Sequence, residues 1–236
     1  MIATVEIPYH LPAPAVKPHI DAGLWSTVMA AILGLVAFVL GLSFSQAEGR
    51  FDVRRNLVIT EANAIGTTWL RANQLPPQDA VRFRSVLTDY TATLLDAYEH
   101  VEQESAFVAA ESRAIADQNV LWTIASDALR KKPMLGHSLL VQTLNDTIDL
   151  SAEQRAQLQQ HVPTFVAALT ILLVIVGSTT IGFGFRRTGS RNVTLAIVYA
   201  VATVIVVEMS IDLDRPQAGV IRVDLTPLRD QLASMR

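Results

Sequence analysis

Three long apolar stretches dominate the pattern of hydrophobic and polar positions along the chain. The first covers residues 24–44 and contains no charged side chain. Two more lie at residues 165–185 and 193–211, where Glu208 is the only charged residue. A helix needs about 20 apolar residues to cross a hydrocarbon core of about 30 Å, and in lipid a helix satisfies its own backbone polar groups. We therefore predict an all-α integral membrane protein with three transmembrane helices.

The region between the first and second apolar stretches has helical rather than strand periodicity. Its clearest apolar face comprises Val58, Ala62, Ile65, Trp69 and Ala72. Spacings of three and four are typical of one face of an amphipathic helix. A long helical pattern starts at Pro77, with a break expected near Ser112, and residues 151–154 resemble a capping box that opens another helix. Pro163 is expected to kink that helix as it enters the second span.

These patterns predict the organisation of the whole chain. It comprises a proline-rich tail at 1–23, a transmembrane helix at 24–44, an α-helical extramembrane domain at 45–161, transmembrane helices at 162–185 and 193–211 joined by a basic loop at 186–192, and a C-terminal tail at 212–236. Within the tail, apolar and charged residues alternate over 220–225, which predicts a short strand or extended segment. Thr226-Pro227 then predicts a final short helix.

The amino-acid composition excludes several classes of function. A formal net charge of −3 argues against a nucleic-acid binder. The chain has no cysteine, so disulfides and thiolate chemistry are excluded. Its histidines show no metal-ligand spacing, and no phosphate loop or nucleophile motif stands out. We therefore expect no enzyme activity, no cofactor and no metal.

The membrane context follows from the first apolar stretch and from the basic residues. That stretch is longer than the 7–15 residues of a signal-peptide core, so we expect an uncleaved anchor in the inner (plasma) membrane. With three spans, the helical domain and the C-terminal tail share one side. Basic residues that favour a cytoplasmic domain are Arg50, Arg54, Arg55, Arg155, Arg215 and Arg222, and those that oppose it are Lys17, Arg186, Arg187 and Arg191. The positive-inside rule then favours a cytoplasmic helical domain.

One candidate site is a polar motif just beyond the first span, formed by Glu61, Asn63 and Gly66 with Arg54 nearby. It has two interpretations. The motif is either a polar site near a pore or helix junction, or a packing motif in which Glu61 pairs with Arg54 or Arg55 and Gly66 sits at a close helix crossing.

A second candidate site follows the third span and contains Asp212, Asp214, Pro216 and Gly219. Carboxylate oxygens suit a hard cation such as Ca²⁺. The alternative is that an aspartate pairs with Arg215 or Arg222.

Two motifs carry a resemblance to a known family. The leading one is Glu-Ala-Asn-Ala-Ile-Gly-Thr at 61–67, followed by Arg71 and Leu75-Pro76. The closing one is Asp212-x-Asp214-x-Pro216-x-x-Gly219, followed by Ile221-x-Val223. Together with the order of one span, a helical domain, two spans and a short tail, they resemble the bacterial bestrophin-like membrane family of unknown function. The resemblance covers roughly residues 24–228.

The resemblance implies kinship with bestrophins, which are pentameric anion channels with a helical cytosolic domain. Bestrophins have four spans and this chain has three, so no pore residue is carried over. The leading hypothesis is a homo-oligomeric channel that conducts an inorganic ion, most simply an anion, across the lipid bilayer. The alternative is a non-conducting membrane scaffold whose helical domain binds a protein partner.

Overall fold

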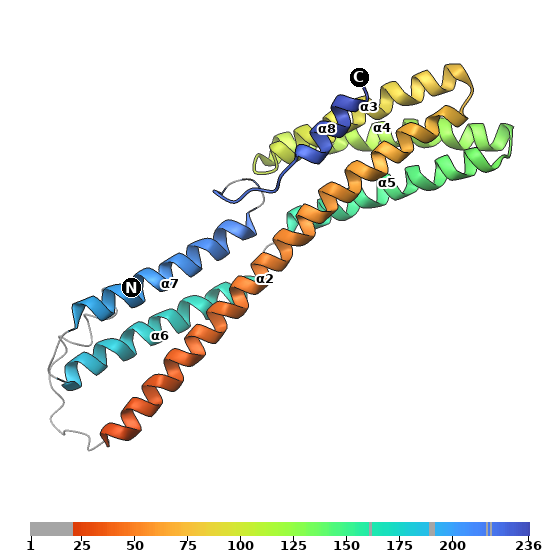
Figure 1. Ribbon diagram of the computed structural model, residues 1–236. Coiled ribbons are helices and arrows are strands. Elements are labelled where there is room, and N and C mark those ends of the chain that lie inside the picture. The colour runs from red at the N-terminus through yellow and green to blue at the C-terminus, as the bar shows by residue number, and fades with distance from the viewer. Residues whose placement is uncertain (1–20, 161, 189–191, 216, 218) are drawn as a thin grey trace. The chain divides into compact units, whose positions relative to one another are not determined.

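In a computed structural model, the described residues (21–160, 162–188, 192–215, 217 and 219–236) form helices joined by short connections, with no strand among them (Figure 1). The elements are α2 (Ala22–Arg71), the 3₁₀ turn η1 (Ala72–Gln74), α3 (Pro77–Glu99), α4 (Glu104–Lys131), α5 (Leu135–Gln159), α6 (Thr164–Thr188), α7 (Val193–Asp214) and α8 (Thr226–Ser234). The predicted proline-rich tail lies almost entirely outside the described residues. The all-α prediction is confirmed.

The chain divides into two compact units. The membrane unit comprises residues 1–49 and 162–214, and the helical unit comprises residues 50–161 and 215–236. Helix α2 contributes its residues up to Gly49 to the membrane unit and those from Arg50 onward to the helical unit.

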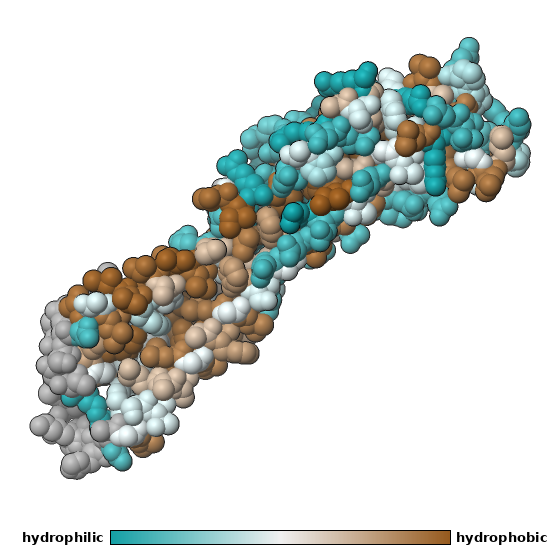
Figure 2. Space-filling view, in the orientation of Figure 1, coloured by the Kyte–Doolittle hydropathy of each residue, from teal (hydrophilic) through white to brown (hydrophobic). Residues whose placement is uncertain are grey.

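The membrane unit is apolar on its outside. Three helical stretches are long and apolar enough to cross a bilayer, which confirms the predicted number of spans. Large apolar side chains are exposed along α6, α7 and the first part of α2, and Figure 2 shows hydrophobic residues gathered over these helices. In lipid such surface is satisfied by acyl chains rather than by a protein core.

Polar and small residues bring the membrane helices together. The hydroxyls of Ser43 on α2 and Thr170 on α6 lie 3.1 Å apart. A Cβ added to Gly177 on α6 would come within 2.5 Å of the Tyr199 hydroxyl of α7 and 3.2 Å of a Val36 methyl of α2. Gly177 therefore allows a close approach of three helices, as small residues do in membrane bundles.

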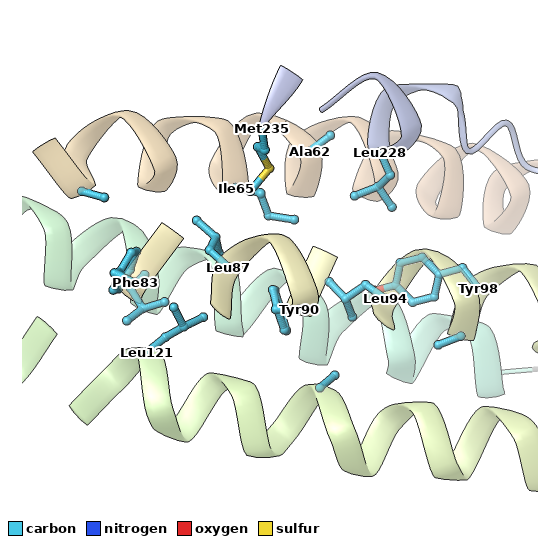
Figure 3. Packing of buried hydrophobic residues seen from close by; sticks show 14 of the residues in the cluster. Ala62, Ile65, Phe83, Leu87, Tyr90, Leu94, Tyr98, Leu121, Leu228 and Met235 are labelled. Atoms are coloured by element: carbon cyan, nitrogen blue, oxygen red, sulfur yellow. The ribbon is translucent and has the colours of Figure 1, made fainter. Parts of the chain in front are cut away.

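The helical unit has a conventional hydrophobic core. The second part of α2 packs with α3, α4, α5 and α8 around one continuous cluster of buried residues. Figure 3 shows Leu228 and Met235, from the C-terminal end of the chain, lying with Ala62 and Ile65 of α2 and Leu87 of α3. The predicted apolar face of this part of α2 therefore points into a core, as amphipathic periodicity requires.

The predicted break near Ser112 is wrong. Helix α3 ends at Glu99 and α4 begins at Glu104, so the chain turns at residues 100–103. In that turn the N–H of Gln103 donates to the carbonyl of His100 at 2.9 Å. Ser112 lies inside α4, where its hydroxyl donates to the Val108 carbonyl. The turn allows the apolar faces of α3 and α4 to pack against each other, and apolar spacing alone does not reveal where such a reversal falls.

The predicted capping box is also wrong. Helix α5 runs unbroken from Leu135 to Gln159, and both Ser151 and Gln154 are buried within it. Burial of Leu144 and Leu158 on either side carries the helix through this sequence. Tertiary packing therefore outweighs a local start signal here.

One other local prediction, the kink at Pro163, needs correction. Pro163 does not kink a continuous helix, because α5 ends at Gln159 and α6 begins at Thr164. Residues 220–225, predicted as a short strand or an extended segment, contain neither strand nor helix. Burial alternates along this segment, as the sequence pattern predicts: Val223 and Leu225 are buried, and Arg222 and Asp224 are exposed. The predicted final helix is present as α8.

Candidate functional site

The side chain of Glu61 lies at the centre of the helical unit. It is fully buried on α2, and the Tyr98 hydroxyl of α3 lies 3.1 Å and 3.0 Å from its two carboxylate oxygens. Burial raises the pKa of Glu61 from 4.5 to about 8, and the hydrogen bond from Tyr98 opposes part of that rise. Among the described residues no arginine pairs with Glu61, so the expected ion pair with Arg54 or Arg55 is absent.

A second tyrosine, Tyr90, extends the Glu61–Tyr98 pair into a buried polar layer that reaches α4 and α5. The side-chain amide of Gln118 donates to the Tyr90 hydroxyl at 3.1 Å and to the Ser151 hydroxyl at 3.2 Å. Burial and the nearby charge of Glu61 raise the pKa of both Tyr90 and Tyr98. Both phenols are therefore neutral at physiological pH and serve as hydrogen-bonding groups.

The charged groups near this layer interact with partners other than Glu61. Arg155 of α5 and Glu111 of α4 form an ion pair at 2.5 Å. Arg54 is fully buried, and it donates from Nε to the Gln157 carbonyl at 3.2 Å and from Nη2 to the Gln160 carbonyl at 3.0 Å. Arg54 thus binds carbonyls at the C-terminal end of α5, where the helix dipole favours a cation.

Asn63 and Gly66 lie near Glu61 in sequence but belong to other surroundings. Asn63 is exposed and lines a surface groove between α2 and α5. Acidic residues of α5 line the same groove, namely Asp146, Asp149 and Glu153. Gly66 faces α8, where a Cβ would come within 2.6 Å of the Gln231 side-chain oxygen. The structure therefore does not bring Glu61, Asn63 and Gly66 together into one pocket.

The residues of the second predicted motif also have separate surroundings in the structure. Both carboxylate oxygens of Asp214 accept a hydrogen bond from the Val162 N–H, at 3.1 Å and 3.2 Å. Gly219 accepts from the Arg222 guanidinium at 3.0 Å. Asp212 is half-buried at the end of α7, and Pro216 lies outside the described residues. Within the described part of the chain, no group of three or more histidine and acidic side chains could hold a metal ion.

Sequence reasoning missed the tyrosines, the glutamine and the serine of the buried layer. Tyr90 lies among apolar residues such as Val86 and Leu94 in the sequence of α3, and nothing local distinguishes such a tyrosine from an ordinary core residue. The one available signal was a carboxylate on the apolar side of α2, because a buried polar group needs a partner. The partner itself lies 37 residues away.

A family model and several solved structures are similar to this chain. A family model described as the bestrophin-like domain matches residues 12–228. A bestrophin homologue from Klebsiella pneumoniae, solved as a point variant, is 16% identical with a TM-score of 0.70, and covers 89% of this chain and 84% of its own. Another structure of that homologue has a TM-score of 0.67 at 16% identity, covering 92% and 85%. A structure described as a membrane protein variant has a TM-score of 0.72 at 16% identity, covering 99% and 94%. No curated protein matches the chain.

Proposed function

Because this chain belongs to the bestrophin-like family, we propose that it is one subunit of an oligomeric ion channel in the inner membrane. The observation that carries the proposal is the family match over residues 12–228, which includes all three spans and most of the helical unit. Kinship with bestrophins makes an anion the first ion to test. The TM-scores of 0.70 and 0.67 to the solved homologues support a shared fold, and at 16% identity the ion still has to be measured.

Self-association is a requirement of this proposal. Three helices are too few to enclose an aqueous path and also shield it from lipid. A ring of identical subunits solves this, because a repeated head-to-tail contact closes around an axis. Exposed small residues on α2, including Gly34 and Gly41, leave room for a neighbouring helix.

The orientation and the ion are part of the same proposal. Basic residues after the first span favour a cytoplasmic helical unit. The acidic groove between α2 and α5 would favour cations if it lay along the conduction path. Kinship with bestrophins points instead to an anion, so a chloride-selective reversal potential is the expected result. Reversal potentials measured in a chloride gradient and in a potassium gradient distinguish the two selectivities.

A second candidate function is a membrane scaffold, and one surface feature favours it. On α4, Val108, Ile115 and Trp122 recur every seven residues and are between 40% and 50% exposed. An apolar stripe with this period is typical of a helix that packs against another helix. A non-conducting protein that uses this stripe to hold a partner would retain the same fold.

The first experiment is the mass of the detergent-solubilised particle, measured by light scattering and corrected for bound detergent. A closed ring of several subunits supports the channel, and a monomer contradicts it. The second experiment is chloride flux from liposomes that contain the purified ring, with empty liposomes as the control. Flux no greater than in the control would reject conduction and leave the scaffold function, which Trp122→Ala would then test by loss of a co-purifying partner.

A further inference from the structure

The hydrogen bonds around Glu61 do not suit an ionised carboxylate. A carboxylate has two oxygens and about four acceptor positions, whereas its partner among the described residues is a single hydroxyl, Tyr98. That hydroxyl has one proton and lies almost equally far from both oxygens. A fully buried negative charge with one neutral donor is costly. A carboxylic acid in the same position has one fewer acceptor to satisfy and supplies a donor of its own.

Charged and titratable groups on each helix around Glu61 leave this imbalance in place. On α3 the neighbours are the neutral phenols Tyr90 and Tyr98. On α4 and α5 the charges are Glu111 and Arg155, which pair with each other. On α2 itself the preceding cations are Arg54 and Arg55; Arg54 donates to the end of α5, and Arg55 is exposed. Helix α8 contributes the uncharged side chain of Gln231, which faces Gly66.

We propose that Glu61 is a proton-binding site: the folded chain holds a proton on this carboxyl group at neutral pH, and its release in alkaline solution weakens the packing of α2 against α3. The proton comes from solvent and returns to it, so no other reactant is required. The proposal concerns the helical unit alone and does not depend on whether the chain conducts ions.

An unsatisfied acceptor on α5 supports a neutral Glu61. The side-chain oxygen of Gln154 is buried and has no hydrogen-bond partner among the described residues. The contacts of Thr68 with Thr147 and of Arg54 with Gln157 set the antiparallel register of α2 and α5. In that register Glu61 and Gln154 occupy the same level of the bundle. A protonated carboxyl group adds a donor at the level where one is lacking.

The sign of the resulting pH dependence is fixed by the direction of the pKa change. The pKa of Glu61 is about 8 in the folded chain, above the ordinary value of 4.5 that it regains on unfolding. The stabilisation from the bound proton is fully present below about pH 4.5 and is lost as pH rises to about 8. Stability therefore falls across this range.

The test uses the full-length protein in detergent and follows thermal unfolding between about pH 5 and pH 9. Wild type is expected to lose melting temperature steadily as pH rises. Glu61→Gln, a neutral mimic of the protonated side chain, is expected to lose that dependence. Glu153→Gln, which removes an exposed carboxylate from α5, is the matched control and should keep the wild-type profile. Identical profiles for wild type and Glu61→Gln would overturn the proposal.

A second measurement decides the matter even if Glu61→Gln does not fold. Infrared spectroscopy separates the carbonyl stretch of a protonated carboxylic acid from that of a carboxylate, and isotope-labelled glutamate identifies the residue type. Wild type at neutral pH should show one protonated glutamate band that disappears in alkaline solution. Absence of that band at neutral pH means that Glu61 is ionised and the proposal is incorrect.

Discussion

The hydroxyls of Thr68 on α2 and Thr147 on α5 lie 3.1 Å apart in the core of the helical unit, and both side chains are buried. The Thr147 hydroxyl also lies 2.9 Å from the Thr143 carbonyl, to which it donates its only proton. Thr68 is therefore the donor and Thr147 the acceptor between the two helices. Because of this direction, loss of the Thr147 hydroxyl and loss of the Thr68 hydroxyl should have different costs.

Replacing these threonines with valine should reveal the inequality. Thr147→Val leaves the Thr68 hydroxyl buried without an acceptor and is expected to lower the free energy of unfolding by roughly 1–3 kcal/mol. Thr68→Val leaves Thr147 still bonded to Thr143 and should cost only about 0.5–1.5 kcal/mol. Denaturant unfolding of both variants and of the double variant measures the difference. Equal costs for the two single variants would contradict the assigned direction.

Replacement of Gly66 by alanine requires one neighbouring side chain, Gln231, to move. Alanine is favoured over glycine inside a helix by roughly 1 kcal/mol, but its Cβ would meet the end of the Gln231 side chain at 2.6 Å. Gly66→Ala alone should therefore gain less than this amount, or lose stability. In a Gln231→Ala background the same substitution should approach the full gain. A double-mutant cycle read by unfolding measures the coupling, and additive effects would show that Gln231 moves aside freely.

Tyr98→Phe should shift the pH dependence of stability as well as its size. Loss of the hydrogen bond to Glu61 is expected to cost about 0.5–1.5 kcal/mol at neutral pH. Because that bond lowers the pKa of Glu61, its removal raises the pKa further. The loss of stability with rising pH should then continue above about pH 8, where wild type has levelled off. Tyr90→Phe, which does not touch the carboxylate, is the control for thermal unfolding across the same pH range.

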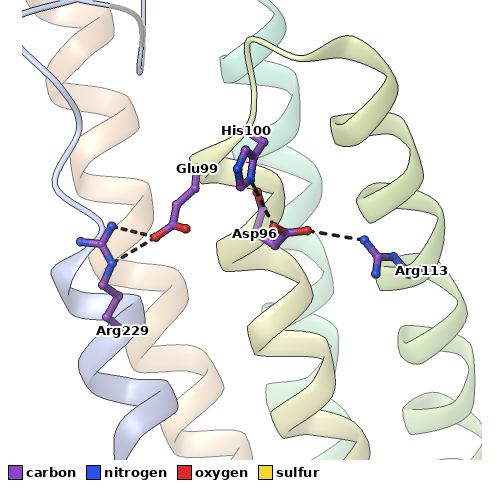
Figure 4. Close-up of polar contacts among 5 residues, drawn as sticks. All are labelled: Asp96, Glu99, His100, Arg113 and Arg229. Carbon is purple, nitrogen blue, oxygen red and sulfur yellow. Dashed lines mark hydrogen bonds and ion pairs between the residues drawn. The ribbon is translucent and has the colours of Figure 1, made fainter.

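The attachment of α8 should depend on its apolar anchor rather than on its ion pair. Leu228 is fully buried in the core, and Leu228→Ala is expected to cost roughly 2–5 kcal/mol and to speed hydrogen exchange across α8. Arg229 donates to Glu99 of α3 at 2.7 Å (Figure 4), but both side chains are exposed. Arg229→Ala should cost at most about 1 kcal/mol, with a smaller cost in high salt. Hydrogen exchange across α8 that is as fast in Arg229→Ala as in Leu228→Ala would show that the ion pair holds the helix.

Much of the fold was predictable because its causes are local. The length and apolarity of three stretches determine three helices that suit a bilayer. The spacing of Val58, Ala62 and Ile65 determines which side of α2 is buried, and the structure buries all three. The two short motifs around Glu61 and Asp212 identified the family. Each of these signals can be read within one helix or one short segment.

The polar layer could not be predicted because it depends on which helix faces meet. The sequence by itself placed Glu61 beside Gly66 and Asn63, which share its segment of α2. Only the tertiary structure brought Tyr98 to its carboxylate, faced Gly66 with Gln231, and carried α5 through Ser151 and Gln154. Side-chain periodicity records that a face is buried, but the register between two helices is set by the packing of the whole core. The partner of a buried polar group is therefore decided in three dimensions.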